Sequence, residues 1–252
     1  MLNNSTTTVF NKKVKSWIAY DVGNSAFATT VVAGFFPVFY NQYWASGIDV
    51  DDATVYKTLA LAICNSIVLL TAPFIGAITD INNATKKTLI LFTTIGALFV
   101  GLLSILSLGS WLYALIFFCI ANYCFAVGQI PYDKILTKIA PQNKLSQISN
   151  QGYAWGYLGG GTLFLVNALM FLYWDKIGFS LLQMQLNCHL LWFPSDRFAF
   201  MLPIKKNYKE NILHHKKTFL INESFKNILT TLRSISQYRK CFFIFISFLS
   251  FY

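Results

Sequence analysis

The sequence is short of charged residues, and of acidic ones in particular. Only 12% of its 252 residues are Asp, Glu, Lys or Arg, and ten of these are acidic, whereas 55% are hydrophobic. The surface of a soluble domain needs about 25–35% charge, so a soluble globular fold is excluded. Disorder is excluded too, because it requires low hydrophobicity and Phe alone occurs 24 times. Most of the chain must therefore be solvated by lipid.

The sequence also lacks the residue patterns of enzymes and metal centres. Its five cysteines are odd in number, form no CxxC pair and lie mostly within apolar runs, which indicates unpaired apolar side chains. The three histidines, His189, His214 and His215, have no carboxylates at ligand spacing. A Walker loop, HExxH and GxSxG are absent from the sequence. We therefore predict a protein that is not an enzyme, has no catalytic residues and holds no cofactor or metal.

Long apolar segments make up the first two thirds of the chain. A helix needs about 20 mostly apolar residues to cross a bilayer. Five segments reach this length with few charges: 17–40, 58–79, 88–108, 111–132 and 152–173. The sequence therefore predicts an all-α polytopic membrane protein, with a cytoplasmic N-terminus over 1–16 and transmembrane helices 1–5 within 17–175.

The last third is less regular. Residues 176–203 are expected to form a weak sixth helix, because polar residues, Asp196 and Arg197 interrupt the apolar run. A charge at a helix centre costs about 2.5–3.5 kcal/mol, so we expect both charges near the inner end, where they can snorkel. Residues 204–240 are expected to be a basic cytoplasmic linker. Residues 241–252 are apolar but too short to cross a bilayer, and we interpret them as the truncated start of a seventh helix.

The net charge of +10 indicates orientation in the membrane. With the N-terminus in the cytoplasm, 17 of the 20 Lys and Arg residues fall in inner segments. This bias follows the positive-inside rule, so we predict an integral multi-pass protein with a cytoplasmic N-terminus, in the inner membrane if the cell is bacterial. The linker at 204–240 could bind nucleic acid, but contact with anionic lipid explains its charge better, and no nucleic-acid partner is predicted.

Polar residues within the first apolar segment are candidates for function. Asp21, Asn24 and Ser25 are spaced so that they share one helix face. Polar groups inside a bilayer are costly unless they face protein or water, so this stripe predicts a path for a solute or a proton. Two other interpretations stay open: Asp21 as an interfacial side chain near the headgroups, and Asn24 and Ser25 as hydrogen-bonding groups between helices.

The fourth apolar segment carries two further polar candidates, Asn122 and Gln129. Pro131 follows Gln129 and frees a backbone carbonyl of the helix, and a broken helix with polar side chains can line a cavity. The pattern predicts that both side chains lie on the same path as Asp21. A helix that simply ends at the membrane surface would show the same residues, and this alternative stays open.

Small residues recur along the fifth apolar segment at Gly152, Gly156 and Gly160. Their four-residue spacing is the pattern that lets another helix approach closely. It predicts a helix-packing face, with a sliding surface as the second interpretation.

The turn between the second and third segments holds Gly76, Asp80, Lys86 and Lys87. Asp80, at the end of one helix, can pair with a Lys at the start of the next. An exposed pair contributes only about 0–1 kcal/mol, which suits a contact that opens and closes. The pattern therefore predicts a gate on the cytoplasmic side.

These motifs resemble the major facilitator superfamily, and in particular its vacuole-effluxer-like branch, which is related to autophagy-linked amino-acid exporters. The likeness lies in Tyr20–Phe27, Phe35–Phe39, Asn122-Tyr123 and Trp155–Gly161, within residues 14–175. Gly76-x-x-x-Asp80 followed by Lys86-Lys87 is similar to the superfamily's loop signature, although Ile81 stands where a basic residue is expected.

The resemblance implies a secondary transporter that works by alternating access. Asp21 and Asn24 would face the central path, and Asp80 with Lys86 or Lys87 would form the inner gate. The fold would be the N-terminal six-helix half of a major-facilitator fold plus an aborted seventh helix, with the glycine-rich helix lying against a missing half. The polar character of 177–200 adds the hypothesis of a compensated reading-frame disturbance there.

The expected partners are the lipid bilayer, a small polar solute, a coupling proton, and either a missing C-terminal half or a second copy of the chain. Amino acids are one candidate for the solute. Two alternatives stay open: a truncated remnant without transport of its own, and a membrane scaffold whose basic linker recruits a partner.

Overall fold

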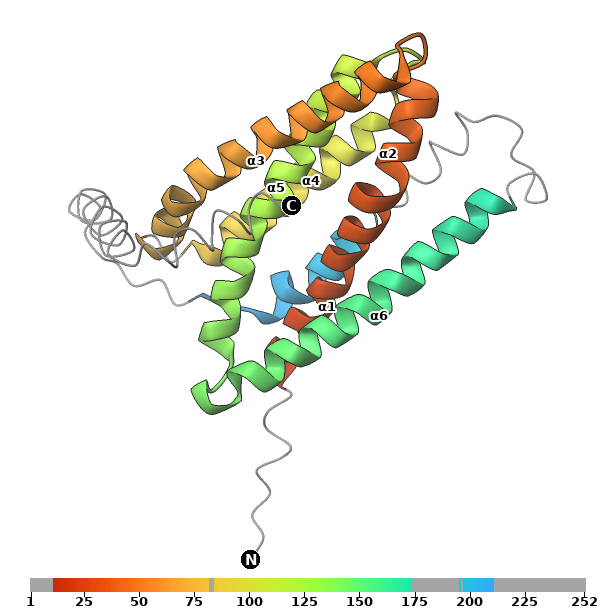
Figure 1. The fold of residues 1–252 in the computed structure, drawn as a ribbon. Helices are drawn as coiled ribbons and strands as arrows, with labels where there is room; N and C mark the ends of the chain where they lie inside the picture. The colour runs from red at the N-terminus through yellow and green to blue at the C-terminus, as the bar shows by residue number, and fades with distance from the viewer. Residues whose placement is uncertain (1–10, 82–83, 174–194, 196, 211–252) are drawn as a thin grey trace, which may run out of the picture.

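The computed structural model describes residues 11–81, 84–173, 195 and 197–210, and within these ranges every regular element is helical (Figure 1). The elements are α1 (Lys12–Ala26), η1 (Phe27–Phe35), α2 (Phe36–Phe39), η2 (Tyr40–Trp44), α3 (Val50–Ile81), α4 (Thr85–Leu103), α5 (Trp111–Ile139), η3 (Gln142–Lys144) and α6 (Leu145–Leu172). A further helical segment covers residues 197–207. The predicted all-α fold is confirmed for the described residues.

Within the described ranges, four helical stretches combine the length and hydropathy needed to cross a bilayer: Lys12–Trp44, Val50–Thr79, Thr85–Leu103 and Trp111–Ile139. They contain or overlap the first four predicted spans and confirm a polytopic membrane fold. The fifth predicted span forms α6, whose 28 residues are also long enough to cross. Of the later predicted segments, most of 176–203, the linker from 211 and all of 241–252 lie outside the described residues.

The first helix begins earlier than the apolar run that predicts it. Oδ1 of Asn11 accepts hydrogen bonds from the backbone N–H groups of Lys13 and Val14, both at 3.0 Å. This side-chain cap satisfies N–H groups that a helix start leaves without partners. The helix therefore extends about one turn into the segment 1–16 that is predicted to be cytoplasmic.

The first helix changes from α-helical to π-helical geometry after its polar residues. η1 and η2 are π-helical stretches on either side of α2, which contains Pro37. Proline lacks the N–H that a regular helical turn would use, and π turns are frequent near functional sites. The first of them starts at Phe27, two residues after Ser25, so the change of helical geometry adjoins the polar residues of α1.

The end of the third predicted span is wrong by five residues, because α4 ends at Leu103 rather than at residue 108. Oγ of Ser104 donates to the carbonyl of Gly101 at 2.6 Å, and Gly109 takes a left-handed φ of 82° in the turn that leads to α5. Ile105 and Leu108 are exposed in this turn. Their apolar character prolongs the predicted span, but it does not make the backbone helical.

Two groups of helices make up the bundle. α1 runs along α6, while α5 packs against both α4 and α3 (Figure 1). Aromatic contacts join the two groups: the rings of Phe36 and Phe118 stack with centroids 3.6 Å apart, and those of Trp17 and Tyr132 stack at 4.5 Å. Nε1 of Trp17 also donates to the carbonyl of Tyr132 at 3.0 Å. These contacts hold α1 and α2 against α5 at two levels of the bundle.

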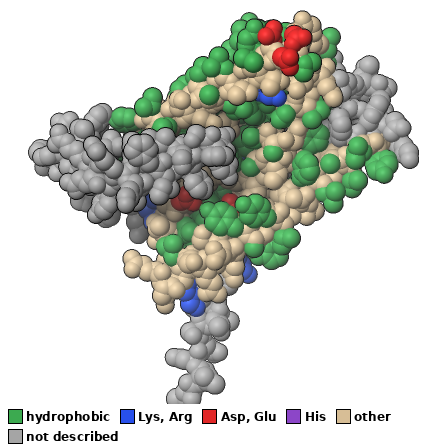
Figure 2. Space-filling view, viewed as in Figure 1, with side chains coloured by type: hydrophobic (Ala, Val, Ile, Leu, Met, Phe, Trp, Pro, Cys, Tyr) green, Lys and Arg blue, Asp and Glu red, His purple; other side chains and the backbone are tan. Residues whose placement is uncertain are grey.

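Large apolar side chains cover much of the outer surface, as in a protein solvated by lipid. Only 6% of the α3 span is buried within the described structure, and Leu59 and Leu70 are exposed along it. Hydrophobic side chains are also spread over α6 on the face seen in Figure 2. Acidic side chains gather in that view near the start of α3, where Asp49, Asp51 and Asp52 are exposed.

Candidate functional site

A polar cavity of about 300 Å³ lies between α1, α5 and α6. Its described lining consists of Asp21, Asn24, Ser25, Ala28 and Thr29 from the first helix, Phe125, Gln129, Tyr132 and Asp133 from α5, and Tyr153 and Tyr157 from α6. The structure thus brings together four of the five residues predicted to lie on a common path. The fifth, Asn122, lies elsewhere.

Helical periodicity explains the contribution of α1. Asp21, Asn24 and Ser25 follow one another at intervals that return to the same face of the helix, and this face looks onto α5 and α6. Asp21 is 4% exposed and Asn24 is 6% exposed. Both polar side chains are therefore removed from lipid, which offsets the cost of placing them within an apolar helix.

The glycines of α6 allow it to lie directly on this polar face. A Cβ atom added to Gly156 would lie 2.6 Å from Oδ2 of Asp21 and 2.8 Å from Oγ of Ser25. A Cβ on Gly160 would lie 2.9 Å from the backbone carbon of Ser25, and one on Gly152 would collide with the ring of Trp17. The small residues thus form a contact surface with α1.

The same contact corrects one expectation drawn from the resemblance. The glycine face of α6 does not point away toward a missing half, because α1 of the same chain covers it. A different face of α6 is exposed, with Tyr153 at 55% and Tyr157 at 71%. These two tyrosines line the cavity as well, so they form part of its open rim.

Arg197 lies behind the cavity wall, and here the sequence prediction was wrong. The side chain was expected to snorkel at the inner end of a sixth helix, but it is only 4% exposed. Its Nη2 donates to Oδ1 of Asn24 at 2.9 Å. Its guanidinium lies 4.6 Å from the ring centroid of Phe27 and 5.6 Å from that of Phe125, in the range of cation–π contact.

Asn122 faces α3 instead of the cavity. Its Nδ2 lies 3.5 Å from Oδ1 of Asn65 and 3.8 Å from Sγ of Cys64. The thiols of Cys64 and Cys119 donate to carbonyls across the same interface, those of Cys119 and Ala60 respectively. The structure therefore gives Asn122 a contact between helices, beside an apolar groove of about 510 Å³ between α3 and α5.

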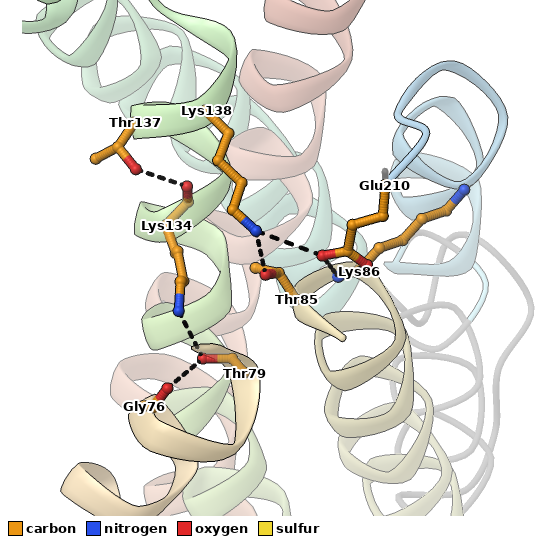
Figure 3. A network of polar contacts seen from close by, with 8 residues as sticks. All are labelled: Gly76, Thr79, Thr85, Lys86, Lys134, Thr137, Lys138 and Glu210. Atoms are coloured by element: carbon orange, nitrogen blue, oxygen red, sulfur yellow. Dashed lines mark hydrogen bonds and ion pairs between the residues drawn. The ribbon is translucent and has the colours of Figure 1, made fainter. Parts of the chain in front are cut away.

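The predicted gate region is built around Glu210, which the sequence did not single out (Figure 3). The carboxylate of Glu210 accepts from the backbone N–H of Lys86 at 3.2 and 3.4 Å and lies 3.6 Å from Nζ of Lys138. It thus occupies the N-terminus of α4, where a negative charge is favoured. Nζ of Lys138 also donates to Oγ1 of Thr85 at 2.8 Å.

The four predicted gate residues are only partly involved in this network. Nζ of Lys86 donates to the carbonyl of Tyr208 at 2.6 Å, and the carbonyl of Gly76 accepts from Oγ1 of Thr79 at 2.6 Å. Lys87 is exposed. The side chain of Asp80 lies outside the described residues, so its predicted pairing with a lysine stays a prediction.

Burial and the neighbouring Glu210 carboxylate raise the pKa of Tyr208 to about 12. The hydroxyl therefore stays neutral where a solvated tyrosine would ionise. Nδ2 of Asn207 donates to Oγ of Ser16 at 2.8 Å. The segment around residues 207–210 thus ties the start of α4 to the start of α1.

Comparison with known proteins confirms the resemblance. Residues 45–145 match the family model described as "Vacuole effluxer Atg22 like". The chain is also similar to a protein of Bacillus subtilis (strain 168) named "Uncharacterized MFS-type transporter YxiO", with 26% identity over 236 residues, which is 92% of this chain and 55% of the relative. The chain therefore spans about half the length of the curated relative it matches. No solved structure matches significantly.

Proposed function

We propose that this chain forms the N-terminal half of a secondary transporter that moves a small polar solute across a membrane by alternating access. The observation that carries the proposal is the cavity between α1, α5 and α6, which gathers Asp21, Asn24, Ser25 and Gln129 within a bundle of apolar helices. Polar side chains at such depth mark solute and ion pathways. The relative's printed description as an MFS-type transporter supports the same class.

In this proposal Asp21 lies on the path of the solute or of a coupling proton. The network of Lys86, Lys138, Tyr208 and Glu210 acts as a cytoplasmic gate, because it joins the ends of α4 and α5 to residues 208–210 through exposed or partly exposed polar contacts. Such contacts are individually weak and can open during a transport cycle. A C-terminal half, or a second copy of the chain, supplies the other wall of the path.

The orientation proposed for the chain has the N-terminus in the cytoplasm. Ser16, near the start of α1, contacts Asn207, and the neighbouring network contributes Lys86, Lys134 and Lys138 to the same end of the bundle. The start of α3 carries exposed acidic residues instead. This charge asymmetry supports the orientation through the positive-inside rule.

Transport assays on reconstituted vesicles test the function. The chain is inserted alone and together with the second half of the B. subtilis relative, supplied as a separate polypeptide, and uptake of radiolabelled amino acids and other small polar solutes is measured. We expect uptake from the combined halves and a strong reduction of it in Asp21→Asn, but not in Asp52→Asn, which removes the same charge at an exposed position. Absence of uptake with both halves inserted would support the remnant interpretation instead.

The same assay tests the proton role. If Asp21 carries a coupling proton, the residual uptake of Asp21→Asn loses its dependence on external pH. A variant with the pH dependence of the unmodified chain contradicts this role while leaving the transport function intact. The proposal that the solute is an amino acid is contradicted if other polar solutes accumulate in the vesicles and amino acids do not.

A further inference from the structure

The cavity between α1, α5 and α6 is unbalanced in charge. Its described lining contains two carboxylates, Asp21 and Asp133, and no basic side chain. Arg197 touches the wall from behind, through Asn24 and Phe125, and is not part of the lining. Among the described residues, Asp21 makes no ion pair although it is only 4% exposed. A buried carboxylate without a counter-charge is costly even with the Tyr132 hydroxyl beside it, so the cavity favours a positively charged occupant.

Aromatic rings surround the same space. Phe125 and Tyr132 of α5 and Tyr153 and Tyr157 of α6 all line the cavity. The faces of such rings attract cations, and cages of aromatic residues bind quaternary ammonium groups. The lining also offers oxygen atoms of the kind that inorganic cations use, so it is the four aromatic side chains that favour a cation carrying methyl or methylene groups.

Neutral polar groups of the lining are also available to a ligand, among them those of Tyr132 and Asn24. The hydroxyl of Tyr132 is buried next to Asp21, and no hydrogen-bond partner of good geometry is found for it in the described structure. The side chain of Tyr132 is 3% exposed. Asn24 has its Oδ1 held by Arg197, so its amide N–H groups are the ones left for the cavity. A buried polar atom without a well-oriented partner is unusual in a native fold, and this hydroxyl can turn either to the Asp21 carboxylate beside it or to an oxygen of a ligand in the cavity.

We infer that this cavity binds a small organic monocation, namely an ammonium compound that also carries a hydroxyl or carbonyl oxygen. The ammonium lies between the carboxylates of Asp21 and Asp133 and against the rings of Tyr153 and Tyr157. The oxygen meets the Tyr132 hydroxyl or the Asn24 amide. The volume of about 300 Å³ lies at the lower end of small-molecule sites. The inference rests on the proposed function and names the class of solute.

Equilibrium binding to the whole chain in lipid nanodiscs tests the inference without requiring transport. The probes are choline and tyramine, each paired with a neutral analogue of similar shape, 3,3-dimethyl-1-butanol and 4-ethylphenol. We expect at least one of the two amines to bind, with its neutral analogue weaker by about tenfold or more. Sodium chloride in excess should not displace the bound amine.

Substitutions of residues that line the cavity test whether the ligand binds there. Asp21→Asn and Asp133→Asn should each weaken amine binding by about tenfold or more, and Tyr157→Leu by about two- to fivefold. Tyr157 and Asp133 are both exposed at the rim, so these two variants test the site even if Asp21→Asn fails to fold. Asp52→Asn, at the exposed start of α3, serves as the charge-matched control and should bind normally.

The inference is overturned if neither amine binds, if the neutral analogues bind equally well, if sodium displaces the amines, or if Asp133→Asn and Tyr157→Leu bind like the unmodified chain. Its failure is distinguishable from failure of the transport proposal. Amine binding without uptake in the two-half vesicles contradicts transport alone. Uptake of an uncharged or anionic solute without amine binding contradicts the cation site alone.

Discussion

Nη2 of Arg197 donates a hydrogen bond of 2.9 Å to Oδ1 of Asn24, although 173 positions separate the two residues. The bond joins the helical segment 197–207 to α1 and fixes the orientation of the Asn24 amide at the cavity wall. Arg197 is buried against Phe27 and Phe125. Its charge is therefore stabilised by the bond to Asn24, by the nearby hydroxyl of Tyr20 and by two aromatic faces within the described structure.

A double-mutant cycle measures this contact. Asn24→Leu should lower the free energy of unfolding by about 2 kcal/mol, because it removes a hydrogen bond to a charged group and leaves the guanidinium buried. Arg197→Met in the same chain should recover part of that loss, because the unpaired charge is then gone. Unfolding in detergent micelles is the measurement. Strictly additive effects of the two substitutions would contradict the coupling.

Substitution of the α6 glycines should separate α6 from α1. Gly156→Ala puts a methyl group within 2.6 Å of Oδ2 of Asp21, and such overpacking costs about 1–3 kcal/mol. Gly161→Ala, in the same helix, is the matched control, because a Cβ there meets nothing within 4 Å. Thermal unfolding should distinguish the two variants. Equal stability of both would show that α6 does not lie on α1 in solution.

Removal of the Glu210 charge should loosen the predicted gate without unfolding the bundle. Glu210→Gln loses the ion pair with Lys138 and weakens the contact with the N-terminus of α4, a total of about 1 kcal/mol or less at a partly exposed site. Faster hydrogen exchange at residues 84–88 is the expected result. Lys87→Gln, at an exposed neighbour, should leave exchange unchanged. An unchanged hydrogen-exchange rate at residues 84–88 in Glu210→Gln would show that the Glu210 carboxylate does not stabilise the predicted gate.

The raised pKa of Tyr208 predicts a loss of stability at high pH. The folded chain keeps this hydroxyl protonated up to about pH 12, whereas the unfolded chain releases the proton near pH 10. The folded state therefore holds more protons between these values, and its stability falls as pH rises through that window. Tyr208→Phe cannot ionise and should show a smaller fall. Identical pH profiles for the two proteins would contradict the burial of Tyr208.

Helix positions and the polar face of α1 were predictable because both follow from local spacing. The apolar runs mark the helices, and the interval between Asp21 and Ser25 returns to one face whatever the neighbours are. Helix ends were less predictable. Asn11 extends the first helix through a side-chain cap, and Ser104 and Gly109 shorten α4 within an apolar run. A hydrophobic average does not register capping or turn geometry.

The polar contacts between segments that are far apart in the chain could not be predicted from the sequence. Gln129 and Asn122 are seven positions apart and look equivalent as polar residues in one apolar helix. The packing of α5 against α3 directs Asn122 toward Asn65, while Gln129 faces the cavity. Glu210 is one charge in a basic region of the sequence, and its role depends on which helix N-terminus it meets.

The amino-acid sequence by itself determined a lipid-solvated bundle of long helices, the charge asymmetry between its two ends and the face on which the polar residues of α1 lie. These follow from composition and periodicity, which act locally along the chain. Only the tertiary structure decided that α6 covers this face through its glycines, that Arg197 is buried behind Asn24 and that Asp133 joins Asp21 in one cavity. Those outcomes depend on which helices pack together, and shape complementarity between surfaces far apart in sequence determines that packing.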